Sequence, residues 1–166
     1  MTATRQLLAN NQAYAASFDR AGTAARPAMK LAIVTCMDAR LDPAQVLGLD
    51  VGDAHVIRNA GGLVTDDVIR SLSISQHKLG TEEIAIVQHT DCGLLSFTDE
   101  EFARARERST GLAPPWSAGT FTDLDENVRE SVRQVVQNPF IPRRDGVRGF
   151  VYEVETGRVR EVLQAG

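Results

Sequence analysis

The sequence predicts an α/β fold, with a mainly parallel central sheet flanked by helices and preceded by a helical arm. Three strand-like runs, at residues 31–36, 55–58 and 84–87, alternate with segments of helical spacing. The runs at 31–36 and 84–87 are almost continuously apolar, which is typical of parallel strands covered on both faces. The alternation of strands and helices along the chain therefore indicates this fold class.

The first predicted element is an amphipathic helix over residues 5–19. Leu7, Leu8, Tyr14 and Phe18 recur there at roughly helical spacing. It precedes the main domain, so it forms an arm that can cover its own core or reach a partner subunit. We assign residues 1–25 to this arm within a single domain spanning 1–166, because 166 residues suffice for one core.

Helix caps mark the middle of the chain. Asp42-Pro43 supplies an N-cap followed by proline at the first helical position, and this helix ends near Gly48. After the strand at 55–58, Gly61-Gly62 interrupts the chain. Thr65 then caps a helix that runs to Leu79 and stops at Gly80.

The rest of the chain continues the alternation. After the strand at 84–87, Thr98 and the acidic residues behind it form a capping box that opens a helix to about Arg108. Residues 111–119 are a loop, and residues 123–137 form a helix. Strands at 147–154 and 158–163 form a hairpin around Thr156-Gly157.

Composition places the protein among ordinary globular chains and argues against some partners. It is 43% hydrophobic and 24% charged, with a net charge of −4. This charge argues against nucleic acid and anionic membranes as partners. The N-terminus lacks the apolar run of a signal peptide, and no run reaches the ~20 residues of a spanning helix. We expect a cytoplasmic protein.

The two cysteines and one histidine follow predicted strands. Cys36 ends the strand at 31–36, while His89 and Cys92 follow the strand at 84–87. The carboxyl ends of such strands meet at one edge of the sheet. Two thiolates and an imidazole suit zinc, and three protein ligands leave one position open, as in catalytic zinc sites. The alternative is a core histidine and small buried cysteines.

Asp38 and Arg40 lie at alternate positions after Cys36. A locally extended backbone would point all three side chains to the same side. Asp38 can orient a nucleophilic hydroxide and can also serve as a fourth metal ligand, while Arg40 can hold Asp38 ionised. An ordinary surface ion pair is the alternative. The backbone N–H groups of Gly61 and Gly62 can contact substrate, since glycine permits close approach.

Three segments together resemble the β-class carbonic anhydrases. They are Cys36-Met37-Asp38-Ala39-Arg40, Arg58-Asn59-Ala60-Gly61 and His89-Thr90-Asp91-Cys92-Gly93. The combination is specific, and the resemblance covers nearly the whole chain. It implies a parallel sheet with an added antiparallel strand. It also implies one Zn²⁺ per chain on Cys36, His89 and Cys92, with Asp38 and Arg40 as catalytic dyad.

The same resemblance implies an activity and an assembly. The activity is the reversible hydration of CO₂ to bicarbonate by zinc-bound hydroxide. The assembly is a homodimer or a dimer-based oligomer, with the N-terminal helix packed on the partner. One departure is Gln88, because similar short members often carry histidine there, which leaves the proton exit route open. Arg58 has two readings, a substrate contact or a partner for a carboxylate at a subunit contact.

Other functions remain open on the same residues. Carbonyl sulfide or carbon disulfide hydrolysis would use the same zinc centre, and the ligand motif does not separate it from CO₂ hydration. A non-catalytic zinc protein would have its site closed by Asp38. A thiol redox protein would instead form a Cys36–Cys92 disulfide and bind no zinc.

Overall fold

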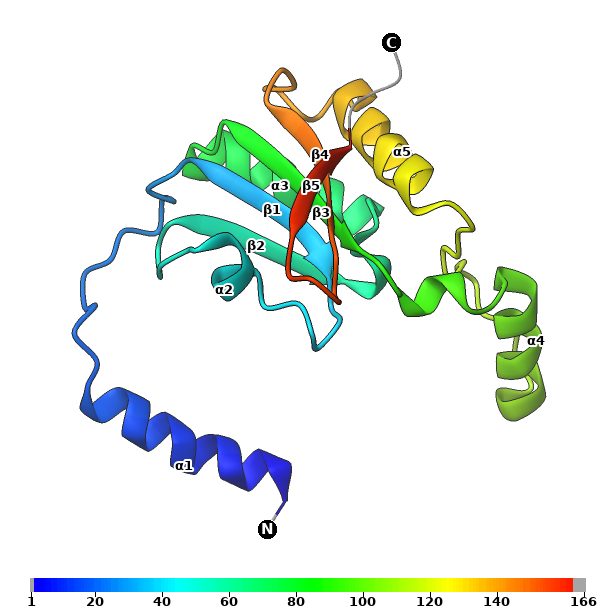
Figure 1. Ribbon diagram of the computed structural model, residues 1–166, viewed down its shortest axis with the longest axis horizontal. Coiled ribbons are helices and arrows are strands. Elements are labelled where there is room, and N and C mark those ends of the chain that lie inside the picture. The colour runs from blue at the N-terminus through cyan, green and yellow to red at the C-terminus, as the bar shows by residue number, and fades with distance from the viewer. Residues whose placement is uncertain (1, 163–166) are drawn as a thin grey trace.

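The protein is built on a five-stranded sheet with the order β2-β1-β3-β4-β5 (Figure 1). The computed structural model describes residues 2–162. The four strands β1 to β4 are mutually parallel and β5 is antiparallel to β4, so the predicted fold class is confirmed. The strands are β1 (Leu31–Cys36), β2 (Ala54–Asn59), β3 (Glu83–His89), β4 (Val147–Tyr152) and β5 (Val159–Val162).

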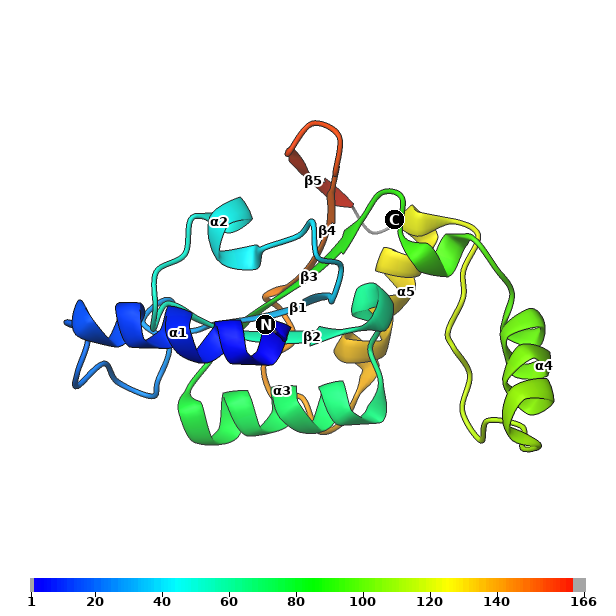
Figure 2. The ribbon, with the colours of Figure 1, turned by 90° about the horizontal axis from the view of Figure 1, so that it is seen from below.

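Helices cover the two faces of the sheet unequally. The long helices α3 (Asp66–Leu79) and α5 (Leu124–Gln137) pack on one face, and the short α2 (Pro43–Leu47) lies on the other (Figure 2). Alternate residues of β1 serve the two sides, as expected for a strand. Ala32 and Val34 join the core under α3 and α5, while Ile33 packs in the cluster on the α2 side.

Two helices project from this body. α1 (Ala3–Ala16) has no buried residue and extends from one side, while α4 (Asp99–Thr110) extends from the other with the loop that follows it (Figure 1). Because none of its residues is buried, the α1 arm does not cover the core of its own chain.

Within residues 2–162, no helix is both long enough and apolar enough to cross a membrane.

The predicted caps are present. Asp42 accepts backbone N–H groups at the start of α2, Gly48 and Gly80 end helices in left-handed conformation, and Thr98 forms a complete capping box. Two short 3₁₀ turns were not predicted because they follow loop geometry rather than a periodic pattern. They are η1 (Ala60–Gly62) and η2 (Gly93–Leu95).

Several predicted boundaries differ from the structure, and those at the N-terminal helix, β4 and β5 are examples. The N-terminal helix ends at Ala16 rather than 19, where the backbone N–H groups of the next turn bond to Tyr14 and Ala15. β4 ends at Tyr152 rather than 154, because the Glu153 carbonyl accepts from Thr156 and Gly157 and so closes the turn early. β5 begins at Val159, one residue after the predicted start, and the predicted last residue, 163, lies outside the described residues.

Candidate metal centre

Two parallel strands bring three metal-binding side chains together. Cys36 is the last residue of β1 and His89 the last residue of β3, and these strands are neighbours. Cys92 follows three residues later, at the start of η2. The ligand atoms of Cys36, His89 and Cys92 all lie within 4.8 Å of one another, and all three residues are buried. The edge predicted from the sequence is therefore the place where these side chains meet.

His89 is oriented as a ligand histidine would be. Its Nδ1 lies 2.8 Å from the Thr90 carbonyl oxygen, which fixes the proton on Nδ1. Its Nε2 is buried and has no hydrogen-bond partner among residues 2–162. Burial lowers the pKa of His89, but the adjacent Cys36 sulfur and the Thr90 carbonyl outweigh it, so the pKa is raised. An unpartnered ring nitrogen beside two thiols fits a metal ion.

The two thiols differ in acidity. Hydrogen bonding from the Cys92 thiol lowers the pKa of Cys36 to about 4, and the same contact raises the pKa of Cys92. The backbone N–H groups of Asp38 and Gly61 also stabilise the Cys36 thiolate. Thiolates and a neutral imidazole are the donors that zinc prefers. The side chains present therefore fit a zinc ion with three protein ligands.

Asp38 and Arg40 form a bidentate pair beside this group. Arg40 Nε and Nη2 donate to the two carboxylate oxygens of Asp38 over 3.0 and 2.8 Å, and the Arg40 backbone N–H donates over 2.8 Å. Asp38 Oδ2 lies 3.7 Å from His89 Nε2. The guanidinium holds the pKa of the Asp38 carboxyl well below its usual range. Asp38 is therefore ionised beside the metal-binding atoms.

Asp91 is a partner of Arg40 that the sequence reasoning missed. Arg40 Nη1 donates to Asp91 Oδ2 over 2.6 Å, and Nη2 donates to the Asp91 carbonyl oxygen over 2.9 Å. Its place between His89 and Cys92 is visible in the sequence. However, only the path of the loop after β1 shows that it faces Arg40.

Arg58, on β2, holds that loop from the other side. It donates to the carbonyl oxygens of Cys36, Asp38 and Leu41 over 2.8–3.0 Å. Among residues 2–162, its partners are thus backbone carbonyls rather than a carboxylate. The segment that carries Asp38 and Arg40 is fixed by these bonds.

The two glycines of η1 lie in different surroundings. Gly61 lines the cavity beside Cys36 and Asp38. Gly62 is buried, and a Cβ atom there would come within 2.9 Å of the Cys36 backbone nitrogen. The Gln88 side chain is also buried and is bonded to Asn127 and Ser131 of α5, so its amide faces away from the cavity.

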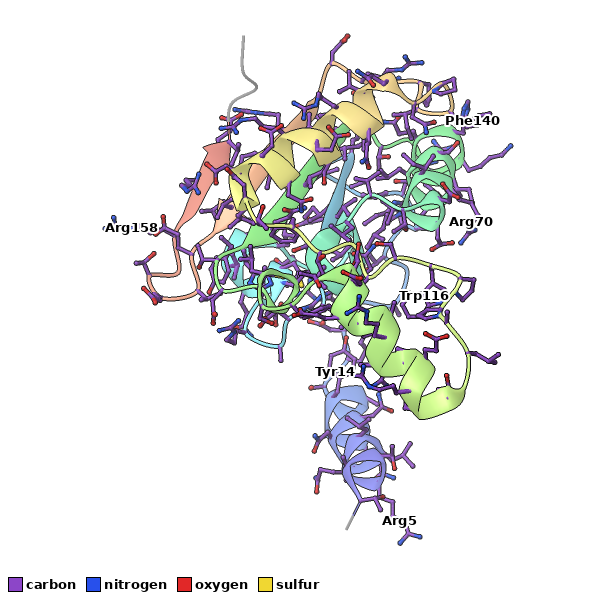
Figure 3. The ribbon with its side chains drawn as sticks, turned by 90° about the vertical axis from the view of Figure 1, so that its right-hand side faces the viewer. Arg5, Tyr14, Arg70, Trp116, Phe140 and Arg158 are labelled. Carbon is purple, nitrogen blue, oxygen red and sulfur yellow. The ribbon has the colours of Figure 1, made fainter. Side chains whose placement is uncertain are left out.

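A cavity of about 640 Å³ opens onto Cys36, Asp38 and Cys92. Its wall includes aromatic side chains from α4 and the loop after it, where Trp116 lies beside the helix (Figure 3). The large apolar residues lining it are Met37, Leu63, Leu94, Phe97, Phe102 and Trp116. Such a wall admits a small apolar molecule and carries few groups that would bind a large polar one.

Comparison with known proteins places these features in one family. Residues 31–116 match the family model described as carbonic anhydrase. The chain is 52% identical over 162 residues to β-carbonic anhydrase 1 of Mycobacterium tuberculosis, covering 98% of this chain and 99% of that protein. It is 38% identical over 159 residues to a carbon disulfide hydrolase of an Acidianus species, covering 81% of this chain and 78% of that protein. A solved carbonic anhydrase from Streptococcus mutans superposes with a TM-score of 0.93 at 46% identity, covering 98% and 99% of the two chains.

Proposed function

This chain belongs to the β-carbonic anhydrase family, and we propose that it catalyses the reversible hydration of CO₂ to bicarbonate. One observation carries the proposal. The buried group of Cys36, His89 and Cys92 has an unpartnered His89 Nε2, and an ionised Asp38 lies beside it. Its cofactor is zinc, one ion per chain, which Cys36, His89 and Cys92 would hold.

The residues around the metal divide the chemistry between them. Zinc bound there supplies Lewis-acid activation of water, which makes water a nucleophile near neutral pH. Asp38 accepts the hydrogen bond of the attacking water and orients its lone pair toward CO₂. Arg40 keeps Asp38 ionised and aimed through the bidentate contact. The apolar wall excludes bulk water from the reacting atoms.

Substrate and proton both pass through the cavity in this proposal. CO₂ enters through the apolar cavity, where Gly61 offers backbone without a side chain. Gly62 supports the substrate contact from behind, because it packs directly on the backbone of β1. Gln88 takes no part in proton transfer, since its amide is bonded within the core. The proton therefore leaves through the open mouth of the cavity.

Asp38 has a second role in the proposal, as a competing fourth ligand of the metal. Its bond to Arg40 favours the arrangement in which the fourth position stays available. We expect the balance to depend on pH, with hydration faster at high pH. A kcat/KM for hydration that stays flat from about pH 6 to 9 would contradict this balance.

Stopped-flow hydration of CO₂ across this pH range, on protein of measured zinc content, tests the proposed activity. We expect rapid hydration by the wild-type protein and a loss of about a hundredfold or more in Asp38→Ala at equal zinc content. Wild-type protein that holds one zinc per chain and shows no hydration at pH 8.5–9 would overturn the proposal. That result would favour a non-catalytic zinc protein.

A second candidate is hydrolysis of carbonyl sulfide or carbon disulfide. The similarity to a carbon disulfide hydrolase favours it, and the apolar cavity would accept either sulfur compound. Parallel assays on one protein preparation would rank CO₂, carbonyl sulfide and carbon disulfide by their kcat/KM values. A higher kcat/KM for a sulfur compound than for CO₂ would reverse our order.

The assembly and location complete the proposal. α1 has no buried residue and carries exposed Leu7, Leu8 and Tyr14, so we assign it to a homodimer contact, alone or within a dimer-based oligomer. Cys36 and Cys92 must stay reduced to serve as ligands, which suits a cytoplasmic location.

A further inference from the structure

Arg40 bonds to two carboxylates that come from different parts of the sheet edge. Asp38 lies two residues away on the loop after β1, and Asp91 lies on the turn after β3. The Arg40 side chain is 48% exposed, so packing alone does not fix it. The positions of its three guanidinium nitrogens are therefore set by the bonds to Asp38 and Asp91.

The turn that carries Asp91 is hydrogen-bonded to the neighbouring strand. Asp91 adopts a left-handed backbone conformation with φ of 53°, which aspartate tolerates better than most residues. The preceding residue is tied to the end of β4, since the Thr90 N–H donates to the Tyr152 carbonyl and Thr90 Oγ1 accepts from the Val154 N–H. The same turn carries His89 and Cys92, so it links the metal ligands to Arg40.

We propose that Asp91 is a positioning residue, which anchors Arg40 and through it holds Asp38 in place beside the metal ligands. This inference rests on the proposed function of the same site. Asp38 and Arg40 lie on the same loop, and Arg58 holds only the backbone of that loop, so neither the Asp38–Arg40 bond nor Arg58 fixes the direction of the Arg40 side chain relative to β3. Asp91 fixes the position of this pair relative to the sheet, because its carboxylate lies on a turn that is hydrogen-bonded at the end of β4.

Two substitutions separate the carboxylate from the backbone conformation. Asp91→Gly removes the side chain and keeps the left-handed backbone accessible, while Asp91→Asn keeps an acceptor and also tolerates that conformation. Asp50→Asn is the matched control. Asp50 is 76% exposed, as is Asp91, and pairs with Arg20, which is 42% exposed, but it lies on the loop after α2.

The kinetic test uses zinc-loaded full-length protein. We expect Asp91→Gly to lower kcat for CO₂ hydration about five- to tenfold at unchanged KM, because a misplaced catalytic pair slows chemistry more than substrate entry. Asp91→Asn should lose less, and Asp50→Asn should match the wild type. Equal kcat in Asp91→Gly and the wild type would overturn the proposal. So would loss of zinc from Asp91→Gly, since the residue would then serve the turn itself.

A second readout needs no activity. In the NMR spectrum, the Arg40 Nε–H signal, identified by its absence in Arg40→Lys, should exchange with water slowly in the wild type. We expect the exchange to quicken in Asp91→Gly and stay unchanged in Asp50→Asn. An Nε–H that is equally protected in Asp91→Gly overturns the positioning role. Wild-type protein that lacks hydration activity but shows the Asp91-dependent signal would refute the proposed function and support the anchor.

Discussion

At the scale of single residues, Arg58 is the side chain on which the geometry of the loop after β1 most depends. It donates to the carbonyl oxygens of Cys36, Asp38 and Leu41. A lysine carries its three N–H donors on one nitrogen and cannot reproduce contacts that Arg58 makes from two separate nitrogens, Nε and Nη2. We therefore expect Arg58→Lys to lower kcat/KM for CO₂ hydration about tenfold and the free energy of unfolding by about 1 kcal/mol.

The Arg58 prediction has a control on the same kind of side chain. Arg70→Lys changes an exposed arginine of α3 that pairs with the exposed Asp67 one turn away, so both quantities should stay at wild-type values. Urea unfolding and stopped-flow hydration measure the two effects. An Arg58→Lys variant with wild-type kcat/KM would show that the loop after β1 keeps its path without the three hydrogen bonds of Arg58.

The grouping of the three metal-binding side chains and the pairing of Arg40 with Asp38 were predictable, whereas the other partners of Arg40 and those of Arg58 were not. Cys36, His89 and Cys92 could be grouped from the sequence because each follows a strand, and parallel strands end at one edge. The contact of Arg40 with Asp91 depends on the path of an irregular loop, which no periodicity encodes. The three carbonyl partners of Arg58 are likewise invisible, because a backbone acceptor has no residue-type signature.

At the scale of elements, the 3₁₀ turn η1 sets the position of Cys36 from behind. Gly62 has a φ of 63°, and a Cβ atom there would lie 2.9 Å from the backbone of Thr35 and Cys36. We expect Gly62→Ala to lower the free energy of unfolding by about 2–4 kcal/mol and to reduce zinc retention, since backbone cannot yield as a side chain can. Urea unfolding and zinc content after dialysis measure this.

Gly80 supplies the comparison for Gly62. It has a φ of 76° at the end of α3, and an added Cβ would meet nothing within 4 Å. Gly80→Ala therefore carries only the cost of the left-handed backbone, about 1 kcal/mol, with normal zinc retention. Similar losses in the two variants would mean that the close approach at Gly62 has no influence on the site.

The loop after α4 is tied to the start of that helix by Asp99. Its carboxylate accepts from the Ser117 hydroxyl and from the backbone N–H groups of Gly119 and Thr120, and the Ser117 bond leads in lowering the pKa of Asp99. A lowered pKa in the folded state means that the stabilisation is complete above the ordinary value of about 3.9 and is lost as pH falls below it.

The fluorescence of Trp116, the single tryptophan of the chain, tests this attachment. Trp116 packs beside Phe102 of α4, so release of the loop should shift its emission to longer wavelength. We expect this shift in the wild type as pH falls below about 4. Asp99→Asn should already show part of the shift at pH 7. Identical wild-type and variant spectra at pH 7 would exclude Asp99 as the tie.

The elements themselves were largely predictable because their ends carry local signals. Asp42, Thr65 and Thr98 each accept backbone N–H groups at a predicted helix start. Errors arose where tertiary hydrogen bonds decide a boundary, as at the turn after β4, where the Glu153 carbonyl accepts the Gly157 N–H. Such a bond depends on the hairpin closing and has no counterpart in the pattern of apolar residues.

At the scale of the whole molecule, the sheet order decides where the site lies. The order β2-β1-β3-β4-β5 puts β1 and β3 side by side, so that Cys36 and His89 end neighbouring strands. Alternation along the chain predicts parallel strands but not their order, since several orders satisfy the right-handed crossover rule.

The proposed dimer can be tested through α1. A 14-residue helix without buried residues is marginal in water, so we expect packing on a partner subunit to stabilise it. Leu7 and Tyr14 are both more than half exposed and, seven residues apart, lie on the same side of the helix. We expect the double variant Leu7→Glu, Tyr14→Glu to raise the dimer dissociation constant at least about tenfold, because it puts charge into an apolar contact. Ala9→Glu adds a charge to the opposite side of α1 and should leave the constant unchanged. Sedimentation velocity over a range of protein concentrations measures all three proteins, and a wild-type chain that stays monomeric throughout would refute the assignment of α1 to a subunit contact.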